Sequence, residues 1–204
     1  MTVLVGARDE VRGKSAAAAL GAFAVPVVLD VTSPSSVAAL AESVSSLYVL
    51  VNNAGILLER GAPPSVDLVR ETYETNVFGV VSVTNAVLPL LRRSPRGRIV
   101  NVSSGLGSLA FASDPSHEYA AHPLLAYGSS KAALNAVTVL YANELRSTRI
   151  KVNAADPGYC ATDLNGHSGP RTAAQGAVAA VRLATLDDDG PTGGFFDDSG
   201  PVPW

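Results

Sequence analysis

Short apolar runs alternate with longer amphipathic stretches along this chain. Runs rich in Val, Ile, Leu, Ala and Phe predict strands at Val3–Val5, Val25–Leu29, Tyr48–Val51, Arg98–Val102, Ile150–Ala154 and Gly194–Phe196. The intervening stretches predict helices at Glu10–Leu20, Ser33–Ser45, Val66–Leu91, Leu124–Arg146 and Pro170–Leu186. Several strands are apolar at nearly every position, which is typical of a sheet covered on both faces. The alternation predicts a doubly wound, mostly parallel α/β fold with three α/β/α layers.

Composition narrows the class of protein. The 204-residue chain is 47% hydrophobic, which is enough for one domain, residues 1–204, with a large core. Its formal net charge of −3 gives no electrostatic reason to expect nucleic acid or an acidic membrane as a partner. The single cysteine, Cys160, excludes an internal disulfide, and Arg8 and Asp9 interrupt any secretory segment. No apolar run approaches the ~18 residues of a membrane span, so we expect a soluble, cytoplasmic protein.

The stretch LLAYGSSKAAL, at residues 124–134, carries candidate chemistry. Tyr127 and Lys131 are four residues apart, so a helix places both on one face, about 5–6 Å apart. A nearby ammonium favours the phenolate and lowers the pKa of a tyrosine from its usual ~10. Tyr127 is therefore a candidate general acid or base, although such a pair also occurs for structural reasons alone.

Polar residues also lie where the predicted buried strands end. RIVNVSSGLG, at 98–107, delivers Ser103 and Ser104 to a strand end, and VLVNNAG (49–55) and NAADPGYCATD (153–163) end in polar turns. Asn76 lies on the apolar face of its predicted helix, where a buried amide needs partners such as a water relay to Lys131. Because the carboxyl ends of parallel strands meet at one edge of a sheet, we expect these groups to form one site.

Taken together, the motifs resemble those of the short-chain dehydrogenase/reductase family. They are NNAG at 52–55, the asparagine of an N-V-x-G pattern at 76, the strand-end serine, Tyr-x-x-x-Lys at 127–131 and Pro-Gly-x-x-x-Thr at 157–162. Each motif alone is weak, but all occur in the family's order, at about its spacings, over nearly the whole chain. The resemblance implies a catalytic tetrad of Asn76, Ser104, Tyr127 and Lys131. Ser104 is preferred to Ser103 because of its place in the family's I-V-N-x-S-S pattern.

The resemblance implies hydride transfer between a nicotinamide cofactor and a small-molecule carbonyl or alcohol. Tyr127 would donate the proton to the carbonyl oxygen, and Ser104 would orient and polarise that oxygen. Lys131 would lower the pKa of Tyr127 and bind the nicotinamide ribose. Asn76 would hold a water that relays protons to Lys131. No metal is expected, and a homo-oligomer is compatible with the family.

A set of cofactor contacts is implied as well. It comprises Arg8 for a 2′-phosphate, Asp30 and Val31 on the adenine side, the turn of Asn53, Ala54 and Gly55, the pair Tyr127 and Lys131, and Pro157, Gly158 and Thr162. Arg8 favours NADP(H) over NAD(H), since a guanidinium suits phosphate. MTVLVGARD resembles the family's second strand, so the first strand and its Thr-Gly-x-x-x-Gly-x-Gly loop have no counterpart. We expect a gap in the sheet or a re-pairing of strands, with weaker cofactor binding.

Three interpretations remain open. The first is an NADP(H)-dependent carbonyl reductase or alcohol dehydrogenase. The second is a protein of this fold that has lost dinucleotide binding and acts as a non-redox acid–base enzyme or as a binding or assembly protein. The third is that the natural chain begins upstream. An unpaired strand edge would then favour dimerisation or aggregation, unless the flanking strands pair with each other.

Two polar loops, Ser113–Pro123 and Tyr159–Pro170, are expected to border the substrate, the second as a movable lid. The apolar residues expected there are Leu106, Leu109, Phe111, Tyr159 and Leu164. Gly105–Ala110 fits a dinucleotide fingerprint, but we reject it because a loop, not a helix, is expected next. Cys160 is expected to be an unreactive loop thiol, and Asp187–Gly190 a solvated helix end.

Overall fold

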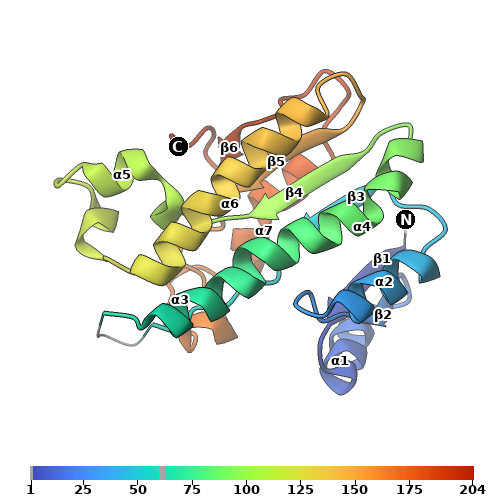
Figure 1. Ribbon diagram of the computed structural model, residues 1–204, viewed down its shortest axis with the longest axis horizontal. Coiled ribbons are helices and arrows are strands. Elements are labelled where there is room, and N and C mark those ends of the chain that lie inside the picture. The colour runs from blue at the N-terminus through green and yellow to red at the C-terminus, as the bar shows by residue number, and fades with distance from the viewer. Residues whose placement is uncertain (1, 60–62) are drawn as a thin grey trace.

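The computed structural model describes residues 2–59 and 63–204 and has an α/β architecture (Figure 1). The strands are β1 (Val3–Ala7), β2 (Ala24–Val28), β3 (Val49–Asn52), β4 (Arg98–Val102), β5 (Lys151–Ala155) and β6 (Phe195–Phe196). The α-helices are α1 (Glu10–Leu20), α2 (Pro34–Ser43), α3 (Val66–Tyr73), α4 (Gly79–Arg93), α5 (Leu109–Ser113), α6 (Leu125–Glu144) and α7 (Ala173–Ala184). Shorter turns are the π-helix η1 (Glu74–Phe78) and the 3₁₀ turns η2 (Gly105–Gly107), η3 (Glu118–Ala121) and η4 (Asp163–Asn165).

The strands form two parallel sheets rather than one. β1 pairs with β2, and a second sheet has the order β3-β4-β5-β6. The predicted fold class is thus confirmed. Of the two outcomes expected around the missing strand, the structure shows the gap, because β1 and β3 do not pair with each other.

Helices cover both faces of the larger sheet, as Figure 1 shows, with α4 and α6 on one side and α7 on the other. Neighbouring β4 residues divide between these faces, since side chains alternate along a strand. Ile99 packs with Leu91 of α4 and with Leu145, which directly follows α6, whereas Val100 packs with Leu183 and other α7 residues. This double cover explains the apolar residues of β4 and β5, while the buried polar residues Arg98, Asn101 and Asn153 have hydrogen-bond partners.

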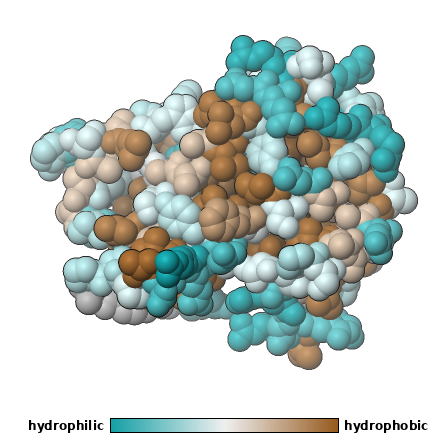
Figure 2. Space-filling model, viewed as in Figure 1, coloured by the Kyte–Doolittle hydropathy of each residue, from teal (hydrophilic) through white to brown (hydrophobic). Residues whose placement is uncertain are grey.

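The β1–β2 sheet is attached to the rest of the molecule by α2 and the loop before it. Helix α2 packs against α4, and Leu40 lies against the core cluster beneath it. Val31 lies against Gly79, where an added Cβ would stand 2.7 Å from a Val31 methyl carbon. Apolar strand residues remain open to solvent here, with Val3 45% and Val51 42% exposed. Figure 2 shows other apolar side chains at the surface of the face that it views.

The helix predicted over Val66–Leu91 continues to Arg93 and contains a π-turn, η1, that sequence patterning did not predict. By length and composition alone, Val66–Arg93 could cross a membrane, contrary to the expectation from apolar run lengths. However, 56% of its most apolar window is buried inside the structure, as in the core helix of a soluble protein.

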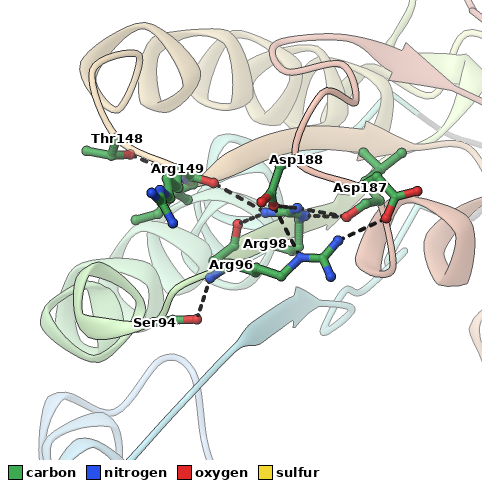
Figure 3. A network of polar contacts seen from close by, with 10 residues as sticks. Ser94, Arg96, Arg98, Thr148, Arg149, Asp187 and Asp188 are labelled. Carbon is green, nitrogen blue, oxygen red and sulfur yellow. Dashed lines mark hydrogen bonds and ion pairs between the residues drawn. The ribbon is translucent and has the colours of Figure 1, made fainter.

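The N-terminal end of β4 carries a polar network that corrects one prediction (Figure 3). Arg98, whose side chain is 3% exposed, donates to the carbonyls of Leu186 and Gly97 and pairs with Asp188 at 3.1 Å. Arg96 pairs with Asp187 at 2.9 Å. The segment after α7 is therefore bound to β4 by ion pairs and is not simply a solvated helix end.

Candidate active site

The predicted catalytic residues gather at the carboxyl ends of the larger sheet, where parallel α/β folds bind ligands. Tyr127 and Lys131 come from the first turns of α6, Ser104 follows β4, and Asn76 comes from η1. Segments far apart in sequence therefore meet in one buried place, with Asn76 0% and Lys131 4% exposed.

Tyr127 and Lys131 stand side by side on α6. The Lys131 ammonium nitrogen lies 5.6 Å from the centre of the Tyr127 ring, so the two side chains share one face of the helix, as their spacing predicts. Lys131 Nζ donates to the carbonyl oxygen of Val102 at 2.8 Å, which ties the helix to the end of β4. A buried ammonium has further donors, so this position suits an oxygen-rich ligand.

The two strand-end serines have different surroundings. Ser103 is 1% exposed, and its hydroxyl donates to Asn135 Oδ1 at 2.6 Å, so it is committed to the packing of α6. Ser104 is only partly buried, and its interaction with the Tyr127 hydroxyl lowers the pKa of that tyrosine. Its hydroxyl also accepts from Leu106 N at 3.2 Å. This arrangement favours Ser104, as the sequence predicted, for contact with a ligand that also meets Tyr127.

Burial, rather than Lys131, has the largest effect on the pKa of Tyr127. It raises the pKa of Tyr127 to about 12, although the Ser104 hydrogen bond lowers it. Burial also lowers the pKa of Lys131 to about 8. The expectation that Lys131 brings the pKa of Tyr127 down is therefore wrong for this structure. A tyrosine that keeps its proton at neutral pH is instead poised to act as a general acid.

Asn76 is fully buried and its side chain is held on several sides. Oδ1 accepts from Ile56 N at 2.8 Å, while Nδ2 donates to Ile56 O and to Ser130 Oγ, each at 3.0 Å. Both amide hydrogens are thus used within the protein, and the relay water stays a prediction. The amide fixes the chain beyond Gly55 against α6, and the surrounding π-turn is a feature often found at functional sites.

Glu59 is a site residue that the sequence analysis missed. It is 7% exposed, and its Oε2 accepts from the backbone N–H of Tyr127 at 2.8 Å. Leu124, at the N-cap of α6, provides no side-chain cap, so Glu59 satisfies one of the free N–H groups of the helix start. An apolar residue at the start of a strongly predicted helix was the available signal that a cap comes from elsewhere.

The predicted cofactor residues lie in two groups. Arg8 and Asp30 follow β1 and β2 and are close enough to interact electrostatically, while Val31 packs beneath them on Gly79. Asn53, Ala54 and Gly55 follow β3, and Pro157, Gly158 and Thr162 follow β5, near the tetrad. Gly55 is central to the second group, because a Cβ there would lie 3.5 Å from Asn76 Oδ1 and 3.6 Å from Lys131 Nζ.

The hydrogen-bond donors near the site indicate which parts of a dinucleotide the chain can bind. The buried Lys131 ammonium beside Tyr127 and Gly55 matches hydroxyl-rich ligands such as a ribose, and the exposed Arg8 guanidinium matches a phosphate. Between them, β1 and β3 are separate strands with no glycine-rich turn after either one. The residues present therefore fit the two ends of a phosphorylated dinucleotide better than its middle.

The segment predicted as the loop Ser113–Pro123 contains the 3₁₀ turn η3. Just before it, residues 109–113 form α5, so the reason given for rejecting the fingerprint at Gly105–Ala110 was wrong. The glycines there serve packing instead: a Cβ on Gly107 would lie 2.7 Å from the Lys131 carbonyl carbon, and the Tyr119 ring lies against Gly105. Tyr119, which the sequence analysis missed, therefore borders the site next to Ser104.

The other residues expected to border the substrate differ in exposure. Leu109 is 68% and Tyr159 54% exposed, whereas Phe111 stacks on His117 with ring centres 3.9 Å apart. Cys160 is buried and donates to Pro157 O at 3.2 Å. The backbone bridge between Cys160 and Arg171 joins the two ends of the Tyr159–Pro170 loop. The lid function of that loop stays a prediction.

Comparison with known proteins places this geometry in a family. A family model described as short chain dehydrogenase matches residues 1–173. A short-chain dehydrogenase of Penicillium roqueforti, anuI, is 40% identical over 199 residues, covering 90% of this chain and 78% of that protein. The NADPH carbonyl reductase 3 of Rattus norvegicus is 34% identical, covering 92% of this chain and 82% of that protein.

Solved structures agree with this assignment. The NADPH-bound carbonyl reductase from chicken fatty liver has a TM-score of 0.85 and 27% identity, covering 100% of this chain and 88% of that one. Salutaridine reductase from Papaver somniferum has a TM-score of 0.82 and 28% identity, covering 97% of this chain and 91% of that one. The chain belongs to the short-chain dehydrogenase/reductase family and is an enzyme of the oxidoreductase class.

Proposed function

We propose that this protein is an NADP(H)-dependent carbonyl reductase or alcohol dehydrogenase acting on a small molecule. The observation that carries the proposal is the buried constellation of Tyr127, Ser104 and Lys131. Ser104 acts on the Tyr127 hydroxyl and lowers the pKa of Tyr127, and the Tyr127 ring centre lies 5.6 Å from the Lys131 ammonium nitrogen. Relatives whose names include NADPH carbonyl reductase share over 30% of their residues with the chain.

In the reductive direction the chain supplies a proton and a polarising contact. Tyr127 keeps its proton at neutral pH and donates it to the carbonyl oxygen as charge develops there. Ser104 donates a hydrogen bond to the same oxygen, which stabilises the negative charge of the transition state. The nicotinamide, when bound, supplies the hydride.

Lys131 and Arg8 give the chain its contacts to the cofactor. Lys131 holds a ribose hydroxyl through the ammonium hydrogens that Val102 does not use. Arg8 stands at the end of β1, where it contacts a 2′-phosphate and so prefers NADP(H) to NAD(H). Asn76 and Glu59 act indirectly, since they hold the turn after β3 and the start of α6 in place.

The test is the rate of NADPH oxidation with a panel of aldehydes and ketones. Tyr127→Phe removes the proton donor and is expected to lower kcat by about 10²–10⁴-fold. Tyr141→Phe is the matched control, because Tyr141 is also on α6 but its hydroxyl donates to Asn85, away from the site. Equal activity of wild type and Tyr127→Phe on every reduced substrate would refute the proposed role.

One observation favours a second function. The sheets are separate, and no glycine-rich turn lies between β1 and β3, where a cofactor's phosphates would need backbone donors. Without a dinucleotide, Tyr127 and Lys131 could still serve non-redox acid–base chemistry, such as a dehydration or isomerisation. A folded chain that turns over such substrates, with no NADPH consumption, would establish this alternative.

A further inference from the structure

Asp156 is a buried carboxylate next to the tetrad for which the proposed mechanism has no use. It follows β5 directly and is 7% exposed, with its backbone N–H donating to Phe196 O at 2.8 Å. An ionised carboxylate in such a place is costly unless backbone or charged groups compensate it. Its surroundings therefore have to explain why an acid, and not an apolar residue, stands there.

The Asp156 side chain joins two loops that carry site residues. Oδ1 accepts from Gly158 N at 2.9 Å, in the turn after β5. Burial raises the pKa of Asp156, and the backbone N–H groups of Gly158 and of Gly105, next to Ser104, oppose that rise by stabilising the carboxylate. The approach is close, because a Cβ on Gly105 would lie 2.9 Å from Asp156 Oδ2.

The same carboxylate acts electrostatically on the groups around it. The titratable or charged groups facing it are Tyr119 from η3, Tyr127 and Lys131 from α6, Arg171 ahead of α7 and Asp197 after β6. Arg171 is compensated by its own ion pair with Asp198, at 2.6 Å. Asp156 is the group whose charge raises the pKa of both Tyr127 and Lys131.

We propose that Asp156 is a positioning residue of this active site. Its carboxylate holds the loops after β4 and β5 together through Gly105 and Gly158, and it places a negative charge beside Tyr127 and Lys131. That charge adds to burial in favouring the protonated phenol and opposes burial in favouring the charged ammonium, which are the states needed of the acid and of the ribose contact. The reaction served is the one proposed above, so the proposal rests on that function.

The Lys131 titration tests the electrostatic part without any substrate. The chain has three lysines, Lys14, Lys131 and Lys151, so carbon-13 labelling of the lysine Cε gives few signals, and Lys131→Arg assigns one of them. In the wild type this signal is expected to titrate near pH 8. Asp156→Asn removes the negative charge and keeps an oxygen for Gly158, so the midpoint is expected to fall by at least about half a pH unit.

Asp197→Asn is the matched control. Asp197 also accepts from backbone N–H groups in a turn, those of Ser199 and Gly200, but its charge does not act on Lys131. The control should leave the Lys131 midpoint unchanged. An unchanged midpoint in folded Asp156→Asn, or an equal shift in both variants, would overturn the proposal.

The pH dependence of reduction gives a second readout that simple loss of structure would not produce. Loss of the charge lowers the pKa of Tyr127 as well as that of Lys131, so the alkaline limb of kcat should move to lower pH in Asp156→Asn. A uniform loss of activity with an unmoved limb would assign Asp156 a structural role only. If no carbonyl substrate is reduced, the proposed function fails, while the lysine titration still decides the role of Asp156.

Discussion

At the scale of single residues, burial decides the protonation of this site more than the pairing of side chains does. The sequence predicted the Tyr127–Lys131 pair and its spacing. It did not predict that burial would raise the pKa of the first and lower that of the second. Fractional exposure depends on contacts from β4, η1 and η2, which lie at a distance in sequence, so a local motif cannot reveal it. The same applies to Glu59, whose carboxylate reaches Tyr127 from 68 residues away.

The buried charge of Lys131 should lower the free energy of unfolding. Lowering its pKa from 10.5 to about 8 corresponds to about 3 kcal/mol, at about 1.4 kcal/mol per unit. Lys131→Met removes this cost but loses the bond to Val102 O, worth about 1 kcal/mol. We expect the free energy of unfolding at pH 7, from urea denaturation, to rise by about 2 kcal/mol while reductase activity is lost.

The sign of this effect can be checked with pH. Because the folded-state pKa of Lys131 lies below the unfolded value, the unfolded chain binds more protons between pH 8 and 10.5, and wild-type stability rises across that window. The advantage of Lys131→Met should therefore be full below pH 8 and vanish above about pH 10.5. A variant that is less stable than wild type at pH 7 would contradict this account.

At the scale of elements, periodicity located the helices and strands well, and the exceptions have physical causes. Helix α1 coincides with its predicted range because Asp9 caps it, accepting from Arg12 N. The π-turn η1 was missed because the apolar spacing of three or four residues continues across it through Tyr73, Val77 and Val80. Helix α5 was missed because it is short and capped only by Ser108. The ion pairs of Asp187 and Asp188 were missed because their partners, Arg96 and Arg98, lie about 90 residues earlier.

Arg98 and Arg96 should differ sharply in their contribution to stability. Arg98→Ala leaves buried carbonyls at Leu186 and Gly97 without their donor, and we expect it to lower the free energy of unfolding by about 3–5 kcal/mol. Arg96→Ala should cost less than about 1 kcal/mol, because the Arg96 side chain is 52% exposed. Thermal and urea denaturation of the two variants measure the difference, and equal losses would contradict it.

At the scale of the whole molecule, the described strands are divided between two separate sheets. β1 and β3 each have one unpaired edge, since β1 pairs only with β2 and β3 only with β4 among the described strands. The sequence predicted a gap or a re-pairing but could not choose between them. The choice depends on how α2 packs against α4, which holds β1 and β2 in place.

Unpaired parallel edges with exposed apolar residues favour self-association. We expect sedimentation velocity of the 204-residue chain to show reversible, concentration-dependent oligomers. Val3→Lys places a charge on β1 and should reduce association. Val11→Lys on α1 is the control, because Val11 is more exposed, at 77% against 45%, but lies off the sheet. A monomer at all concentrations, or equal effects of both substitutions, would exclude edge pairing.

The most direct test of the central claim, that this site holds a nicotinamide dinucleotide for carbonyl reduction, is calorimetric titration of the purified chain with NADPH. The account predicts saturable NADPH binding with a higher affinity than NADH binding. Arg8→Ala should weaken the affinity for NADPH about 10-fold or more and leave the affinity for NADH unchanged. Arg12→Ala, in the first turn of α1, should leave the affinity for NADPH and for NADH unchanged. Absence of binding at millimolar NADPH, by a chain shown to be folded, would contradict the account and leave the non-redox alternative.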